Sequence, residues 1–202
     1  MHAAKEQAEA AITLSTERGF PHRLAEGVLL QGWALAMQGQ TEEGIAQLRQ
    51  GMAAWRATGA EIAWPLWLAL LAEAYGKAGQ AGEGLTVLAE ARALVHKTEE
   101  RFWEAELYRL TGELLLAQED TRDKGQKLEA VETCFRQALD IARRQQAKSL
   151  ELRATMSLSR LWQRQGKRTE AHALLAPIYG WFTEGFETAD LREAKELLEA
   201  LS

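Results

Sequence analysis

Two stretches of the sequence decide the fold: residues 31–51, QGWALAMQGQTEEGIAQLRQG, and residues 71–91, LAEAYGKAGQAGEGLTVLAEA. Each has a small residue at its second position and a large one at its fifth, then a glycine, then a second run in which small residues flank a leucine. Small residues on one helix face let a second helix approach closely, and a large neighbour fills the remaining gap. The spacing therefore predicts pairs of packed antiparallel helices.

The same marks recur twice more along the chain. The small first-helix residues stand at intervals of 40, 40 and 47 residues, and they are Gly32, Ala72, Gly112 and Ser159. The third unit is longer by seven residues, which fall in the polar stretch 118–127 and predict an expanded loop between two helices. Repetition at such a period is the sequence signature of a helical repeat protein.

These marks resemble the tetratricopeptide repeat (TPR). The long form of the repeat is similar to that in bacterial multidomain signalling ATPases, nucleotide-cyclase-linked ATPases and maltose-regulator-type activators. Residues 179–194, YGWFTEGFETADLREA, resemble the end of the repeat region in such ATPases. The resemblance implies an all-α fold, an antiparallel helix-pair solenoid that forms a right-handed superhelix of about ten helices, with the first helix of each pair on the concave side.

The repeat register sets the expected helices and boundaries. We expect helices at residues 2–18, 22–38, 41–57, 61–77, 81–96, 99–118, 125–146, 148–165, 168–182 and 188–200. They form one domain over 1–202, with repeats at 20–59, 60–99, 100–146 and 147–182 and a C-terminal capping helix in 183–202. Residues 1–19 repeat the second-helix pattern that ends at Gly59, without a first helix before it. We infer a piece excised from a longer protein, with an unusual N-terminal cap as the alternative.

Composition excludes several classes of protein. A formal net charge of -5 argues against a nucleic-acid partner, since phosphate binding needs a concentrated basic face. The longest apolar run, residues 66–72, is too short to span a bilayer, and the charged N-terminus lacks the apolar core of a secretory signal. The single cysteine, Cys134, cannot form an internal disulfide. We expect a cytoplasmic protein with no nucleic-acid or membrane partner.

The sequence also lacks the patterns of catalysis and metal binding. No two of the four histidines lie within four residues of each other, and no cysteine or acidic pair completes a metal-ligand spacing. Neither a Walker loop nor a Gly-x-Ser-x-Gly motif occurs. We therefore expect no catalytic residue, no metal, no cofactor and no enzymatic activity.

The resemblance places ligand contacts on the face of each first helix that points away from the second helix. Projected onto this sequence, the binding residues are Leu29, Trp33, Met37, Glu73, Lys77, Arg109, Glu113, Arg153, Arg160 and Arg164. The first of these helices is apolar and the last is basic, which suits an amphipathic helix or an extended peptide with an acidic end. Trp33 remains open between ligand contact and packing. The carboxylate clamp for chaperone C-termini is excluded, because it relies on asparagines and the chain has none.

The leading functional hypothesis is a protein–protein interaction and regulatory module, a fragment of a larger bacterial signal-transduction protein. It would bind a peptide, or a neighbouring domain of the same parent chain, in its concave groove. The alternative is the sensor domain of a transcription regulator or signalling ATPase, in which a small-molecule inducer is lined by Trp33, Met37, Glu73 and Arg109. A homodimer through the N-terminal helix is a further option.

Overall fold

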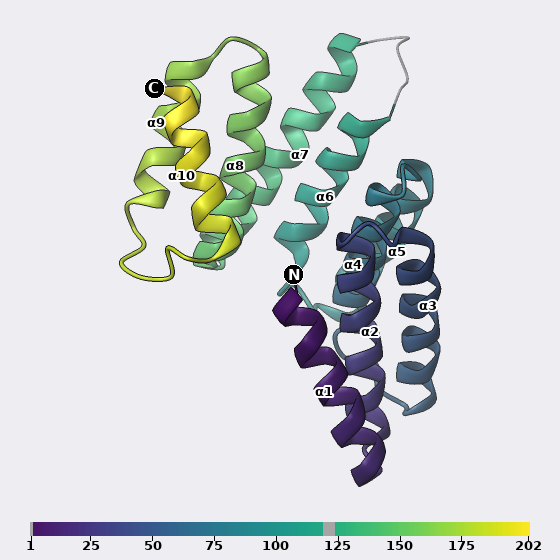
Figure 1. The fold of residues 1–202 in the computed structure, drawn as a ribbon. Coiled ribbons are helices and arrows are strands. Elements are labelled where there is room, and N and C mark those ends of the chain that lie inside the picture. Colours follow the sequence, from purple (N-terminus) through teal and green to yellow (C-terminus); the bar gives the residue numbers. More distant parts are fainter. Residues whose placement is uncertain (1, 119–123) are drawn as a thin grey trace. The chain divides into compact units, whose positions relative to one another are not determined.

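A computed structural model describes residues 2–118 and 124–202, and over these residues the protein consists of ten α-helices and no strand (Figure 1). The helices are α1 (His2–Arg18), α2 (Pro21–Met37), α3 (Thr41–Ala57), α4 (Trp64–Lys77), α5 (Ala81–Thr98), α6 (Glu104–Ala117), α7 (Lys124–Arg144), α8 (Lys148–Arg164), α9 (Arg168–Tyr179) and α10 (Ala189–Leu201). No helix in the described part of the chain has the length and apolar character that a membrane crossing requires.

The helices fall into two compact units, Met1–Arg101 (unit 1) and Phe102–Ser202 (unit 2). In unit 1, α2 pairs with α3 and α4 pairs with α5, while α1 packs against α2 and α4 also packs against α2 and α3. In unit 2, α6 pairs with α7 and α8 pairs with α9. The predicted helix pairs are therefore present, and the assignment of residues 1–202 to a single domain stays a prediction.

Glycines explain how closely α2 and α3 approach each other. A Cβ atom added to Gly44 would lie 2.5 Å from the carbonyl oxygen of Gly32 and 2.6 Å from the backbone nitrogen of Ala36. The two backbones are thus in direct contact, and no side chain fits between them. In unit 2 the same approach brings Gly112 of α6 onto the ring of Phe135 in α7, which is 1% exposed.

Aromatic rings fill the junction between the two helix pairs of unit 1. Trp55 near the end of α3 is buried, with its ring centroid 4.0 Å from that of His22 in α2 and 5.0 Å from that of Trp67 in α4. Three successive helices therefore meet around one indole. Aromatic contacts of this kind add to the stability gained from burying apolar area.

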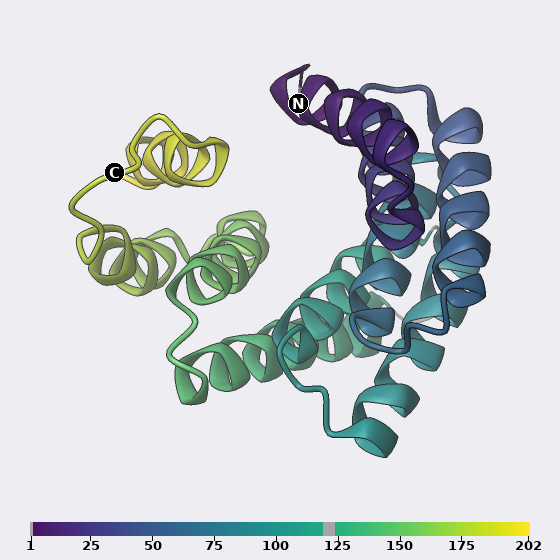
Figure 2. The same ribbon diagram turned by 90° about the horizontal axis from the view of Figure 1, so that it is seen from below.

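The C-terminal helix α10 packs against both α8 and α9, as α4 packs against α2 and α3 (Figures 1 and 2). Its buried residues Leu191, Ala194 and Leu197 join a core cluster with Leu152 of α8 and Leu175 of α9. Within unit 2, α10 thus lies where the first helix of a further repeat would lie.

Two helices begin later than the repeat register predicts. α4 was expected from residue 61 and begins at Trp64, and α6 was expected from residue 99 and begins at Glu104. Ala63 and Glu99 have left-handed backbones, with φ of 64° and 58°, and an α-helix cannot continue through such a residue. The second helix of the third pair was expected from residue 125 and α7 begins at Lys124, so the last residues of the loop predicted at 118–127 are helical. Residues 119–123 of that loop lie outside the described part of the chain.

Candidate functional site

In unit 1, two parallel rows of side chains line the face of α2 and α4 that points away from their second helices. We call this set the unit 1 face, and it comprises Leu30, Trp33 and Met37 of α2 with Leu66, Leu70, Glu73 and Lys77 of α4. Leu30 is 39% exposed, Lys77 is exposed, and the others are half-buried. Each row repeats at helical spacing, so its members share one side of the helix. Five of the seven residues are apolar, which is unusual for solvent-accessible positions in adjacent helices.

The structure corrects the position of one predicted binding residue. Leu29 is 0% exposed and faces α3, where a Cβ on Gly51 would lie 2.8 Å from its Cγ. Its neighbour Leu30, one position further around the helix, is on the unit 1 face instead. The prediction was off by one residue. The small residues of the repeat show which side of α2 contacts α3, but they do not show which residues lie on the opposite, outward side.

A hydrogen bond links the two rows at their centre. The indole Nε1 of Trp33 donates to the Glu73 carboxylate at 2.7 Å, across the two first helices. Trp33 is therefore both an inter-repeat contact and a partly accessible side chain, so the two hypotheses for this residue are compatible. Met37 and Lys77 lie one turn further on, at the C-terminal ends of their helices.

In unit 2, the corresponding face of α6 and α8 carries a network of charged residues. Arg109 donates two hydrogen bonds to Glu106, at 2.9 and 2.7 Å, and both side chains are almost fully buried. Arg153 of α8 adds a third contact, with its guanidinium 3.1 Å from a Glu106 oxygen. The Arg109–Glu106 pair is thus bidentate within α6, a geometry that fixes both side chains, and Arg153 connects it to α8.

The remaining predicted residues of unit 2 continue this network. Glu113 accepts a hydrogen bond of 2.6 Å from the hydroxyl of Ser157 and lies 3.5 Å from Arg109. Arg160 pairs with Glu193 of α10 at 2.8 Å. Arg164 is exposed and forms no ion pair within the described residues. The basic character predicted for α8 is therefore largely neutralised by acidic residues of α6 and α10.

Burial and charge oppose each other at Glu106. Burial alone would raise the pKa of its carboxyl, but the attraction and hydrogen bonds of Arg109, with the further charge of Arg153, hold the pKa below its ordinary value. The same balance lowers the pKa of Glu151, which accepts hydrogen bonds from Lys148 and Arg143 at 2.7 and 3.0 Å. Both carboxylates are therefore charged at neutral pH and stabilise unit 2.

The predicted site residues thus divide between the two units. Trp33, Met37, Glu73 and Lys77 come together in unit 1, whereas the other glutamate and the arginines belong to unit 2. Sequence reasoning missed Leu30 and Leu70, although a 40-residue shift relates them to each other as it relates Trp33 to Glu73. Among the described residues, no group of three or more histidine, cysteine, aspartate or glutamate side chains is arranged to hold a metal ion.

Comparison with known proteins identifies the fold. No family model matches the chain. An uncharacterized protein of Rhizobium meliloti (strain 1021) is 31% identical over 136 residues, and the match covers 67% of this chain but only 13% of that protein. The chain therefore spans a small part of the curated relative that it matches.

Two solved structures share the architecture. One contains nearly identical TPR-like repeats described as those of a Podosopora anserina kinesin light chain, with a TM-score of 0.61, 20% sequence identity, and coverage of 90% of this chain and 86% of that one. A single-substitution variant of the same repeat protein gives a TM-score of 0.60 at 20% identity, with coverage of 90% and 93%. Together with the ten helices and their pairwise packing, these likenesses show that the chain has the tetratricopeptide-like repeat fold.

Proposed function

We propose that this protein is a protein-interaction module that binds a peptide segment of a partner on the unit 1 face. The observation that carries the proposal is the pair of accessible apolar rows on α2 and α4. A contiguous apolar surface rimmed by polar groups is typical of a protein-binding site. Leu30, Trp33 and Met37 would hold the apolar residues of the peptide in this arrangement.

Charge gives the bound peptide a direction. Lys77 is exposed at the C-terminal end of α4 and has no ion-pair partner in the described part of the chain. Glu73 is already bonded to Trp33. The preferred peptide therefore carries an acidic residue next to its apolar segment, at the end that lies against Lys77. An amphipathic helix and an extended strand both allow this order of residues.

The experiment is a peptide-display selection against the whole chain, followed by calorimetric titration of the selected peptides. We expect apolar residues and one acidic residue to be enriched. Trp33→Ala should weaken binding by at least tenfold, which corresponds to about 1.4 kcal/mol. Lys77→Glu should reverse the preference for an acidic residue. Leu14→Ala, which truncates a leucine that is 55% exposed on α1, serves as the matched control and should bind normally.

Two results would contradict the proposal: selection of no peptide, or selected peptides that bind Trp33→Ala as well as they bind the unchanged protein. The second would place the binding surface elsewhere on the chain. In the small-molecule alternative, Trp33, Met37 and Glu73 would share a lining with Arg109. Arg109 belongs to unit 2 and is already bonded to Glu106, which argues against that shared lining.

The wider role that we propose is regulation within a larger bacterial signalling protein, in which the bound peptide belongs to the same parent chain or to a separate partner. The resemblance of residues 179–194 to the end of such repeat regions supports this proposal, as does the match to a small part of a much longer Rhizobium meliloti protein. Light scattering of the purified chain tests the further option of a homodimer through α1. A monomer at micromolar concentration would exclude it.

A further inference from the structure

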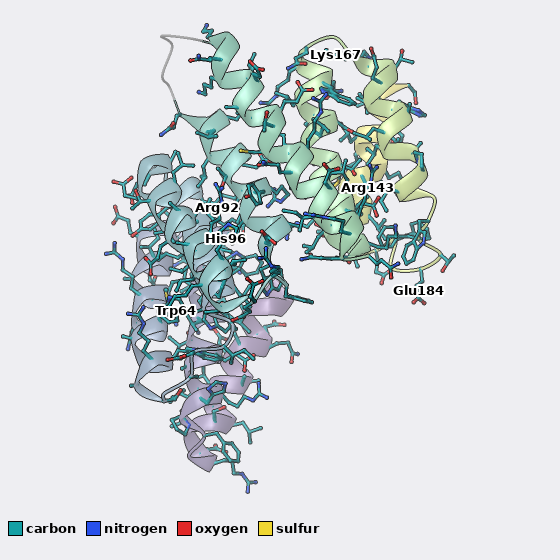
Figure 3. The ribbon with its side chains drawn as sticks, turned by 180° about the vertical axis from the view of Figure 1, so that it is seen from behind. Trp64, Arg92, His96, Arg143, Lys167 and Glu184 are labelled. Atoms are coloured by element: carbon teal, nitrogen blue, oxygen red, sulfur yellow. The ribbon has the colours of Figure 1, made fainter. Side chains whose placement is uncertain are left out.

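Unit 1 contains a hollow that shares no residue with the unit 1 face. It lies where the C-terminal turns of α3 and α5 meet the N-terminal turn of α4, and its volume is about 450 Å³. This volume is within the range of small-molecule binding sites, roughly 300–1,000 Å³. Its apolar wall is made by Trp64, Pro65 and Leu94. Trp64 is labelled in Figure 3.

An arginine is held over the aromatic part of this wall. The guanidinium carbon of Arg56 lies 4.1 Å from the ring centroid of Trp64, in a cation–π contact. The side chain of Arg56 makes no ion pair and no hydrogen bond with any described residue. A stacked guanidinium keeps the N–H groups in its plane available, and their fork matches the two oxygens of a carboxylate.

A second cation borders the same hollow. Lys97 in the last turn of α5 is exposed, and it too has no charged partner among the described residues. Of the two acidic residues in the lining, Glu100 is occupied, because its Oε1 accepts a 2.8 Å hydrogen bond from the backbone N–H of Ala63. Only Glu61 is an acid without a partner among the described residues of this lining. The lining therefore carries two positive and two negative charges, and one of the two carboxylates, Glu100, is directed at the backbone N–H of Ala63.

The stacked arginine also decides which ligand charge fits. A cationic ligand would need the face of Trp64, but the positive guanidinium of Arg56 already covers a face of that ring. An uncharged apolar ligand would leave Arg56 and Lys97 without a partner. A ligand with an anionic group next to an apolar group would pair with Arg56 and Lys97 and would also pack against the apolar wall.

We propose that this hollow binds a small organic carboxylate with an apolar body. The apolar body packs on Trp64, Pro65 and Leu94, and the carboxylate pairs with Arg56 and Lys97. The bond from Ala63 to Glu100 positions Trp64, because Ala63 directly precedes the first residue of α4. This site is independent of the peptide-binding function proposed above, since the two surfaces have no residue in common.

Nuclear magnetic resonance of the tryptophan side chains tests the proposal on the whole chain. The probe is 3-phenylpropionate, and its uncharged counterpart 3-phenylpropionamide has nearly the same shape. Trp64→Phe identifies the Trp64 indole N–H signal by its disappearance. We expect 3-phenylpropionate to shift this signal in a saturable way, with a dissociation constant on the order of 1 mM, as is usual for so small a ligand. The amide should bind at least tenfold more weakly.

Charge-removing variants locate the carboxylate. Arg56→Gln and Lys97→Gln should each weaken 3-phenylpropionate binding by about tenfold, a typical effect of losing one charged hydrogen bond. Arg18→Gln, which removes an exposed charge at the end of α1, is the matched control and should leave the affinity unchanged. If Arg56→Gln fails to fold, Lys97→Gln at its exposed position still tests the proposal.

Three outcomes would overturn the proposal. The first is that the Trp64 signal shows no saturable shift at about 20 mM 3-phenylpropionate, roughly twenty times the expected dissociation constant. The second is that the amide binds with the same affinity as the carboxylate. The third is that Arg18→Gln weakens 3-phenylpropionate binding as much as Arg56→Gln and Lys97→Gln do. Peptide binding on the unit 1 face is measured separately with the selected peptides. A failure of this proposal is therefore distinguishable from a failure of the proposed function.

Discussion

At the scale of single residues, α8 contains a buried hydroxyl that the fold leaves unsatisfied. The side chain of Thr155 is 0% exposed, and its Oγ1 has no hydrogen-bond partner among the described residues. A buried polar group without a partner lowers stability, because it loses its hydrogen bonds to water on folding. Replacing this residue therefore tests how much the unsatisfied hydroxyl, at constant side-chain shape, costs the stability of unit 2.

We predict that Thr155→Val raises the free energy of unfolding by about 1 kcal/mol, because valine keeps the shape of the side chain and removes the unsatisfied hydroxyl. Thr111→Val is the matched control. Thr111 is also buried, but its hydroxyl donates a 2.7 Å hydrogen bond to the carbonyl oxygen of Leu107. The control should show no such gain. Urea denaturation followed by circular dichroism measures both variants, and equal effects would refute the argument.

At the scale of helices, close approach between α2 and α3 depends on the absence of side chains at Gly44 and Gly32. We predict that Gly44→Ala lowers the free energy of unfolding by about 1–3 kcal/mol, because its Cβ would overlap backbone atoms that cannot move independently. The better helix propensity of alanine offsets only part of this loss.

Gly82→Ala is the matched control for this prediction. Gly82 lies in the first turn of α5, and a Cβ added there would meet no atom within 4 Å. The same substitution should therefore be neutral or stabilise the protein by up to about 1 kcal/mol. Thermal unfolding of the two variants measures the contrast. If both substitutions have the same effect, contact between the backbones of α2 and α3 is not what limits position 44.

The helix pairs were predictable because two helices that approach each other closely require small residues at fixed positions, and these residues can be read from the sequence. Gly32 and Gly44 recur as Ala72 and Gly84, so the pairing and most helix ends follow from the register. The late starts of α4 and α6 were not predictable in this way. They depend on left-handed residues at Ala63 and Glu99, and neither residue type favours that conformation.

The candidate site was less predictable than the fold. The sequence identified Trp33 and Glu73 as members of equivalent rows, but their hydrogen bond to each other depends on side-chain conformation. Likewise, Arg153 and Arg160 were expected to form a basic surface, whereas Glu106 and Glu193 from neighbouring helices neutralise them. Pairings between helices far apart in sequence depend on the tertiary structure, so a helix projected by itself cannot show them.

At the scale of the whole molecule, a repeat protein gains its stability locally, because each helix pair contacts mainly its neighbours. A change that weakens one unit therefore does not have to weaken the other equally. The buried and partly buried carboxylates with lowered pKa values, Glu106 and Glu151, both belong to unit 2. In unit 1 the pKa of Glu99 is also lowered, by its hydrogen bond with Arg101, but this carboxylate is exposed to solvent and screened.

The sign of the pH dependence follows from these directions. A carboxyl whose pKa is lower in the folded than in the unfolded protein stabilises the fold fully above its ordinary pKa of 4.5. The stabilisation is lost as the pH falls below that value toward the folded pKa. We therefore predict that acidification from about pH 6 to about pH 3.5 weakens unit 2 more than unit 1.

Amide hydrogen exchange, with rates corrected for the intrinsic effect of pH, measures the two units in the same sample. Protection should fall more in α6, α7 and α8 than in α2, α3 and α4, because Arg109 and Arg153 lose the charge of Glu106 and remain partly desolvated. Glu129→Gln, which removes an exposed carboxylate on α7, is the control and should leave the difference unchanged. Equal loss of protection in both units would mean that acid acts through the general charge of the molecule, and the ion pairs of unit 2 would then contribute little to its stability.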